Sequence, residues 1–197
     1  HYPLRRQRQM CIRDSIYLEI DILEYADITD LDEILKLDPR YYPYIRIIKS
    51  DKKEIDIELF NKCGFKRLRE LILSNNTNIK ANDLTMLPKT LQVLNLEENN
   101  NITDNGLKYL PRTLQELYLW NNSNITDNGL KDLPKNLQKL YLDWNKNITD
   151  NGLKYLPKNL QILNLHCNEN ITDNGLKDLP KNLQVLYLNF NDDITDN

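Results

Sequence analysis

The sequence predicts an α/β solenoid with parallel strands on its concave face and short helices on its convex face. The tetrapeptide Ile-Thr-Asp-Asn begins at Ile102, Ile125, Ile148, Ile171 and Ile194, so it recurs at one constant spacing. Each unit also carries the pattern Leu-x-x-Leu-x-Leu, followed by an Asn and then by a Leu-Pro pair. A fixed period of this length is the signature of stacked repeats, each of which buries its apolar face only against its neighbours.

Residues 1–15 differ from the rest of the chain. Positions 5–15 read RRQRQMCIRDS, which matches the in-frame translation of a widely used transposase sequencing adaptor. We therefore expect residues 1–15 not to be native and the natural N-terminus to be missing. The alternative, a basic arm or a targeting peptide, lacks the apolar region of a secretory signal.

The charge balance of the native part is acidic. Without the four arginines and one aspartate of the adaptor-like segment, 26 basic and 29 acidic residues become 22 and 28, and the net charge moves from -3 to -6. This balance argues against nucleic acid or an anionic membrane as the partner. No apolar run approaches the length needed to span a bilayer.

Residues 16–43 carry no repeat and predict two helices with Thr29 as a cap between them. The apolar residues at helical spacing are Leu18, Ile22, Leu23, Tyr25, Leu31, Ile34, Leu35 and Leu37. From Glu19 onward the segment resembles an F-box, a resemblance that implies docking on a cullin-ligase adaptor. The Leu-Pro that normally opens an F-box is absent, and no Trp follows the second helix. The alternative is a helical cap that protects the end of the solenoid.

Residues 44–67 predict a degenerate N-capping repeat. Ile45, Ile47 and Ile48 favour a first irregular strand, and the apolar residues from Ile55 to Cys63 favour a helix that ends at Gly64. A solenoid needs such a unit because the core of its terminal coil would otherwise face water.

Residues 68–197 predict regular leucine-bearing repeats, each about 23 residues long. The alternating leucines of each unit, such as Leu94 and Leu96, should point inward from a short strand. The Asn after the strand should satisfy turn backbone groups of its own and neighbouring coils. It recurs at Asn76, Asn99, Asn122, Asn145, Asn168 and Asn191. The Thr of each unit should cap a short helix and the Gly should allow tight packing on the next coil.

This skeleton resembles the leucine-rich repeat. The phrase Asn-x-x-Ile-Thr-Asp-x-Gly-Leu is similar to the cysteine-containing subclass that is typical of F-box proteins. Two features depart from that subclass: Asn replaces the Cys, and the repeating unit is shorter than usual. The chain stops inside a repeat at Asn197, so we expect the protein to continue.

Side chains that flank the inward leucines should face the concave surface, where solenoids usually bind. Exposed aromatic side chains on a rigid sheet are typical of interface hot spots. The alternative is that some of them only cover the edge of the core. The candidate partner-binding residues are Tyr118, Trp120, Tyr141, Asp143, Trp144, Asn164, His166, Tyr187 and Asn189.

Catalytic and metal-binding signals are weak. His166 and Cys167 are adjacent, but successive strand residues point to opposite sides and no third partner is fixed beside them. Asp104 and its equivalents could suggest a calcium ladder, but their place at helix starts explains them better. Apart from Cys11 in the adaptor-like segment, two cysteines remain, which is too few for a disulfide framework and typical of a reducing compartment.

We therefore expect a cytoplasmic protein-interaction module that is not an enzyme and needs no cofactor or metal. By resemblance, it would be the substrate-recognition part of an F-box-type ubiquitin ligase, with a target protein on its concave face and a cullin-ligase adaptor on residues 16–43. Two alternatives stay open. One is a stand-alone recognition scaffold or effector, and the other is a fragment of a repeat-bearing enzyme whose catalytic domain is missing.

Overall fold

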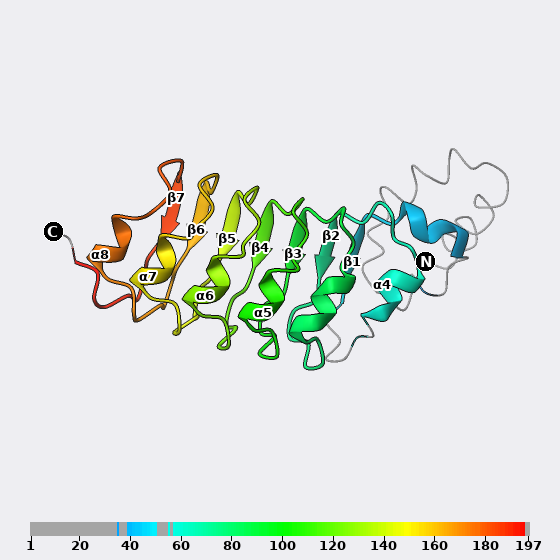
Figure 1. Ribbon diagram of the computed structural model, residues 1–197, viewed down its shortest axis with the longest axis horizontal. Coiled ribbons are helices and arrows are strands. Elements are labelled where there is room, and N and C mark those ends of the chain that lie inside the picture. Colours follow the sequence, from blue (N-terminus) through cyan, green and yellow to red (C-terminus); the bar gives the residue numbers. More distant parts are fainter. Residues whose placement is uncertain (1–34, 36–38, 51–54, 56, 196–197) are drawn as a thin grey trace, which may run out of the picture.

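The computed structural model describes residues 35, 39–50, 55 and 57–195. In this part of the chain, seven parallel strands form one open sheet in sequence order, from β1 to β7. Figure 1 shows the strands side by side along the long axis of the molecule, with the short helices α5 to α8 in a second row. This arrangement confirms the predicted α/β solenoid.

Each strand contains three residues and pairs with the equivalent residues of the next coil, for example Val93 with Glu116. Each strand residue therefore pairs with the residue one repeat length later in the sequence. The strands are β1 Ile47–Lys49, β2 Glu70–Ile72, β3 Val93–Asn95, β4 Glu116–Tyr118, β5 Lys139–Tyr141, β6 Ile162–Asn164 and β7 Val185–Tyr187.

The core is one continuous column of leucines and isoleucines behind the sheet. The central strand residue and the leucine two positions on, such as Leu94 and Leu96, are fully buried from β2 to β6. In the last coil, Leu186 and Leu188 are only partly buried, because no further coil covers them within the described residues. This gradient follows from a fold in which each repeat is buried by its neighbours.

From α5 to α8, the helices are single turns that start at the Asp after the repeated Thr. They are α5 Asp104–Leu107, α6 Asp127–Leu130, α7 Asp150–Leu153 and α8 Asp173–Leu176. The hydroxyl of Thr126 accepts a cap hydrogen bond from the Asn128 amide, and the same bond caps α7 and α8. Thr103 occupies the cap position of α5, but its side chain makes no cap hydrogen bond.

Six buried asparagines follow strands β2 to β7 and join each turn to the next. We call them the Asn ladder. The Asn122 Oδ1 accepts from the Asn99 amide at 3.0 Å, and its Nδ2 donates to the Leu96 carbonyl at 2.9 Å and to the Trp120 carbonyl at 3.3 Å. A buried amide that satisfies groups of two coils removes the cost of burying them unpaired. The predicted structural role of these asparagines is confirmed.

A second ladder joins the helix side and was not predicted. The two oxygens of Asp104 accept from the backbone amide and the hydroxyl of Thr126 in the next coil, at 2.8 and 2.7 Å. The same pair of bonds recurs three more times along the array. The aspartates therefore bond across coils as well as standing at helix starts.

The glycine of the repeat allows this close approach. A Cβ placed on Gly129 would lie 2.5 Å from Asp104 Oδ1 and 2.9 Å from Leu107 Cδ1. Any side chain at this position would push the Asp104 carboxylate away from Thr126. The predicted role of the glycine in tight packing on the neighbouring coil is thus confirmed.

Before the regular repeats, the described residues include the 3-10 helix η1 Pro39–Tyr44 and helix α4 Glu58–Lys62, and in the first repeat the 3-10 helix η2 Ala81–Met86 stands where later repeats have an α-helix. The Phe65 ring packs against Tyr42 and Phe60, with ring centroids 5.6 and 5.9 Å apart. Gly64 has a φ of 62°. The contacts of Phe65 with Tyr42 and Phe60 form a buried aromatic cluster at the β1 end of the solenoid.

Several sequence-based predictions lie outside the described residues. The adaptor-like segment 1–15 is one of them. The two helices expected in residues 16–43 are another, apart from Leu35 and the Pro39–Tyr44 segment. The F-box resemblance therefore stays a prediction from sequence.

Candidate functional site

The exposed sheet face consists of the side chains that flank the inward leucines. The outer residues of each strand form its first two rows, and the second residue after each strand, such as Trp120, forms a third. Because the register of the sheet equals the repeat length, equivalent residues of successive coils lie side by side. Eight of the nine candidate residues belong to these rows, and Trp144 directly follows Asp143.

Two tyrosines form a stacked pair at the centre of this face. The rings of Tyr118 and Tyr141 are parallel within 2°, with centroids 4.3 Å apart. The Tyr118 hydroxyl donates to Glu116 Oε2 at 3.2 Å, and Lys139 Nζ lies 2.7 Å from Glu116 Oε1. Burial is the largest cause that raises the pKa of Tyr118, and the neighbouring Tyr141 and Glu116 raise it further. The pair is an aromatic platform held by its neighbours.

Further aromatic side chains stand in the same coils and in later ones. Trp120 is half-buried next to the pair, while Trp144 and Tyr187 are 46% and 47% exposed and Phe190 is 71% exposed. The Phe190 ring meets the His166 ring edge-on, with centroids 5.0 Å apart. Such rings bring large apolar area to a surface at low entropic cost.

The residue directly before the ladder Asn has a left-handed backbone. Its φ is 52° at Asn121, 59° at Trp144, 56° at Cys167 and 59° at Phe190. Asn tolerates this conformation, but a bulky side chain there is uncommon and costs about 1–2 kcal/mol. The turn imposes the conformation, so Trp144 and Phe190 sit at strained positions that the fold does not require to be aromatic.

Carboxylates stand beside the aromatic residues. Asp143 and Glu97 are both half-buried and lie in the row of Trp120, Asp143 one coil after Trp120 and Glu97 one coil before it. Desolvation by burial is the largest cause of the raised pKa of Asp143. The negative charge of Glu97 raises this pKa further, and His166 lowers it. The protein therefore holds a partly desolvated negative charge on this face.

The His166 and Cys167 pair is not arranged as an activated nucleophile. Desolvation is the largest cause that raises the pKa of Cys167, and Asp143 and Glu169 raise it further. A higher pKa reduces the thiolate fraction that nucleophilic attack requires. In the described part of the chain, no group of three or more His, Cys, Asp or Glu side chains could hold a metal ion.

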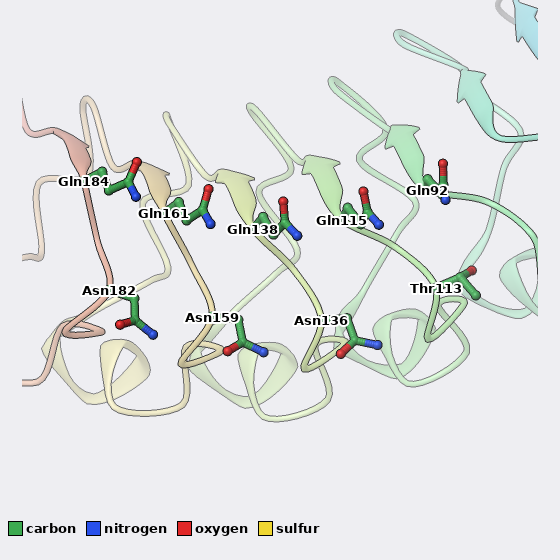
Figure 2. A pocket seen from close by; sticks show the side chains of 9 residues that line it. All are labelled: Gln92, Thr113, Gln115, Asn136, Gln138, Asn159, Gln161, Asn182 and Gln184. Atoms are coloured by element: carbon green, nitrogen blue, oxygen red, sulfur yellow. The ribbon is translucent and has the colours of Figure 1, made fainter.

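A polar groove of about 650 Å³ follows the starts of strands β3 to β7. Figure 2 shows two parallel rows of side chains along it, glutamines in one and mainly asparagines in the other. The lining residues are Gln92, Thr113, Gln115, Asn136, Gln138, Asn159, Gln161, Asn182 and Gln184.

The asparagine row of this groove is already engaged within the solenoid. The Nδ2 groups of Asn136 and Asn159 donate to the backbone carbonyls of Arg112 and Lys135 in the preceding coils, at 3.0 and 3.1 Å. Sequence reasoning missed this groove, although an identical Gln directly before every strand from β3 to β7 was a signal for it. The repetition of the same amides in each coil gives the groove a uniform, uncharged lining.

Comparison with known protein families recognises the repeating unit of this chain. The family model described as Leucine Rich repeat matches residues 88–110, 134–156 and 157–179. No curated protein sequence matches the chain. None of the described helices is both long enough and apolar enough to cross a membrane.

Two solved structures share the fold. The leucine-rich repeat-containing protein LegL7 from Legionella pneumophila is 16% identical, with a TM-score of 0.58, and the match covers 87% of this chain and 69% of that one. An internalin (inlF) from Listeria monocytogenes is 20% identical, with a TM-score of 0.57, and the match covers 81% of this chain and 51% of that one. The repeat pattern and the family-model matches show that the chain contains leucine-rich repeats, and the parallel sheet and the two solved structures show that it has the leucine-rich-repeat fold.

Proposed function

We propose that this leucine-rich-repeat protein is a protein-recognition scaffold that binds its target on the exposed sheet face through the platform of Tyr118, Trp120 and Tyr141. The stacked Tyr118 and Tyr141 pair carries the proposal. A rigid platform of large rings needs little ordering when a partner binds, so most of the buried apolar area contributes to affinity.

The variation along the array supports the same conclusion. Positions that hold coils together repeat the same residue, whereas most positions of the exposed sheet face differ between neighbouring coils, for example from Asn95 to Tyr118 and from Glu97 to Trp120. Packing between coils does not demand this variety. A surface fitted to a partner makes use of such variety, because different pockets of the partner accept different side chains.

A random dodecapeptide library selected on the full chain tests this proposal. We expect selected peptides to lose affinity at least tenfold when Trp120 and Tyr141 are both replaced by Ala, because hot-spot aromatics dominate binding energy. Fluorescence anisotropy gives Kd, and thermal melts should show a nearly unchanged Tm. Tyr155→Ala on the helix side, where the ring is 38% exposed, is the matched control and should leave Kd within about twofold. Peptides that bind the double variant as well as the parent would rule the platform out.

The finer proposal is a cytoplasmic substrate receptor of an F-box-type ubiquitin ligase. It rests on the sequence of residues 16–43 and on the similarity of the repeats to the cysteine-containing subclass. Binding of the full chain to a purified cullin-ligase adaptor, lost when Leu23 and Leu31 are replaced by Glu, would support it. Without such binding, the scaffold would act without a ligase.

A further inference from the structure

From the charges of the exposed sheet face we infer the chemistry of the partner, and this inference rests on the proposed function. Within the described residues, this face and the turn at Glu98 carry five carboxylates and two lysines, along with His166. Lys49 lies 3.9 Å from Glu70, and Lys139 lies 2.7 Å from Glu116. Both lysines are therefore already paired with carboxylates.

Three carboxylates remain without an ion-pair partner among the described residues, namely Glu97, Glu98 and Asp143. Two of them flank Trp120: Glu97 is the equivalent residue of the preceding coil and Asp143 that of the following coil. Neighbouring strands are about 4.8 Å apart, so the backbones of Glu97 and Asp143 are separated by about 10 Å with the indole between them. Like charges at this spacing repel, and partial burial weakens their hydration.

The helix side of the same molecule shows the opposite arrangement. There, Lys108 Nζ lies 4.9 Å from the centroid of the Tyr109 ring, and Lys131 Nζ lies 4.9 Å from that of Tyr155. In the described part of the chain, no lysine or arginine lies over Trp120 or Trp144 in this way. Among the described residues, lysines therefore lie over tyrosine rings on the helix side, whereas neither Trp120 nor Trp144 has such a cation.

We propose that the exposed sheet face takes up an arginine side chain from a basic segment of the partner protein, stacked on Trp120 between Glu97 and Asp143. A guanidinium is planar, stacks on aromatic rings and donates to two carboxylates at once, which a lysine ammonium does less well. It also supplies a positive charge to Glu97 and Asp143, neither of which makes an ion pair among the described residues. The acidic balance of the chain, with a net charge of -3, favours approach of such a segment.

Peptides selected on the full chain that depend on Trp120 provide the test. We expect them to contain an arginine whose replacement by citrulline, which has nearly the same shape but no charge, weakens binding about tenfold or more. Replacement of the same arginine by lysine should weaken binding less, by about threefold. Anisotropy titrations of synthetic peptides give these ratios.

A matched pair of protein variants separates local from general charge effects. The double variant Glu97→Gln, Asp143→Asn should bind the arginine peptide about tenfold more weakly. In this variant, citrulline should cause little further loss of affinity, because the protein change and the peptide change delete the same contact. Asp132→Asn with Asp178→Asn alters the charge equally on the helix side and should change Kd less than about twofold.

The outcomes distinguish the two proposals. If peptides that depend on Trp120 and Tyr141 bind equally well with citrulline, or contain no arginine, the platform binds a target but the cationic partner is wrong. If both pairs of charge variants weaken binding equally, the attraction is unspecific and the inference also fails. If no peptide depends on Trp120 and Tyr141, the proposed function fails and this inference fails with it.

Discussion

The Asn ladder and the exposed sheet face lie side by side along the same solenoid and follow opposite rules. From Asn76 to Asn191 the ladder residue never changes and is buried at every coil. The second strand row changes from Lys49 to Ile72, Asn95 and Tyr118 within the first four coils. Identical residues are needed where each coil completes the hydrogen bonds of the next. Residues are free to differ where a side chain meets only solvent or a partner.

The largest effect should come from breaking the ladder itself. Asn122→Ala leaves the Asn99 amide and the Leu96 carbonyl without their buried partner, which should lower the free energy of unfolding by about 3 kcal/mol. Urea denaturation followed by circular dichroism measures this change.

The matched control is an asparagine on the exposed sheet face. Asn164 Oδ1 accepts from the His166 amide at 3.0 Å, but the residue is only half-buried. Water can replace the lost acceptor, so Asn164→Ala should cost less than about 1 kcal/mol. Equal losses for the two variants would contradict the distinction between ladder and face.

A smaller effect should follow from blocking the contact between coils on the helix side. Gly129→Ala places a Cβ against the Asp104 carboxylate and displaces it from Thr126, which should lower the free energy of unfolding by about 2 kcal/mol. The control is Asn151→Ala at an exposed position of α7, where a change within about 0.5 kcal/mol is expected. If the Gly129→Ala protein were as stable as the parent, the close approach of the two coils would not contribute to the free energy of unfolding.

The smallest effect should be a gain in stability at a surface position. Phe190→Asn puts a residue that tolerates the left-handed backbone at a φ of 59°, so the free energy of unfolding should rise by about 0.5 kcal/mol. The reverse exchange, Asn121→Phe at a φ of 52°, should lower it by about 1 kcal/mol. Thermal melts of both variants check the pair, and a loss at Phe190→Asn would mean that its contact with His166 outweighs the backbone strain.

The arrangement of the candidate site residues in rows could be predicted because the repeat transfers local geometry from one coil to all others. The period placed Tyr118 and Tyr141 in one row, which the stacked rings at 4.3 Å now show. The bonds from Asp104 to Thr126 could not be predicted in the same way. A carboxylate at a helix N-terminus interacts favourably with the helix dipole whether or not it also bonds to the next coil, so the sequence pattern is the same in both cases.

By itself, the sequence determined the class of fold, the register of the sheet and the identity of the buried column, because a constant period with fixed leucines allows one way of stacking. Only the tertiary structure decided which charges are paired, which turns are left-handed and where the glutamine groove runs. These properties depend on distances between side chains of different coils. A linear pattern gives the order of such residues, and only the packed coils give their separation.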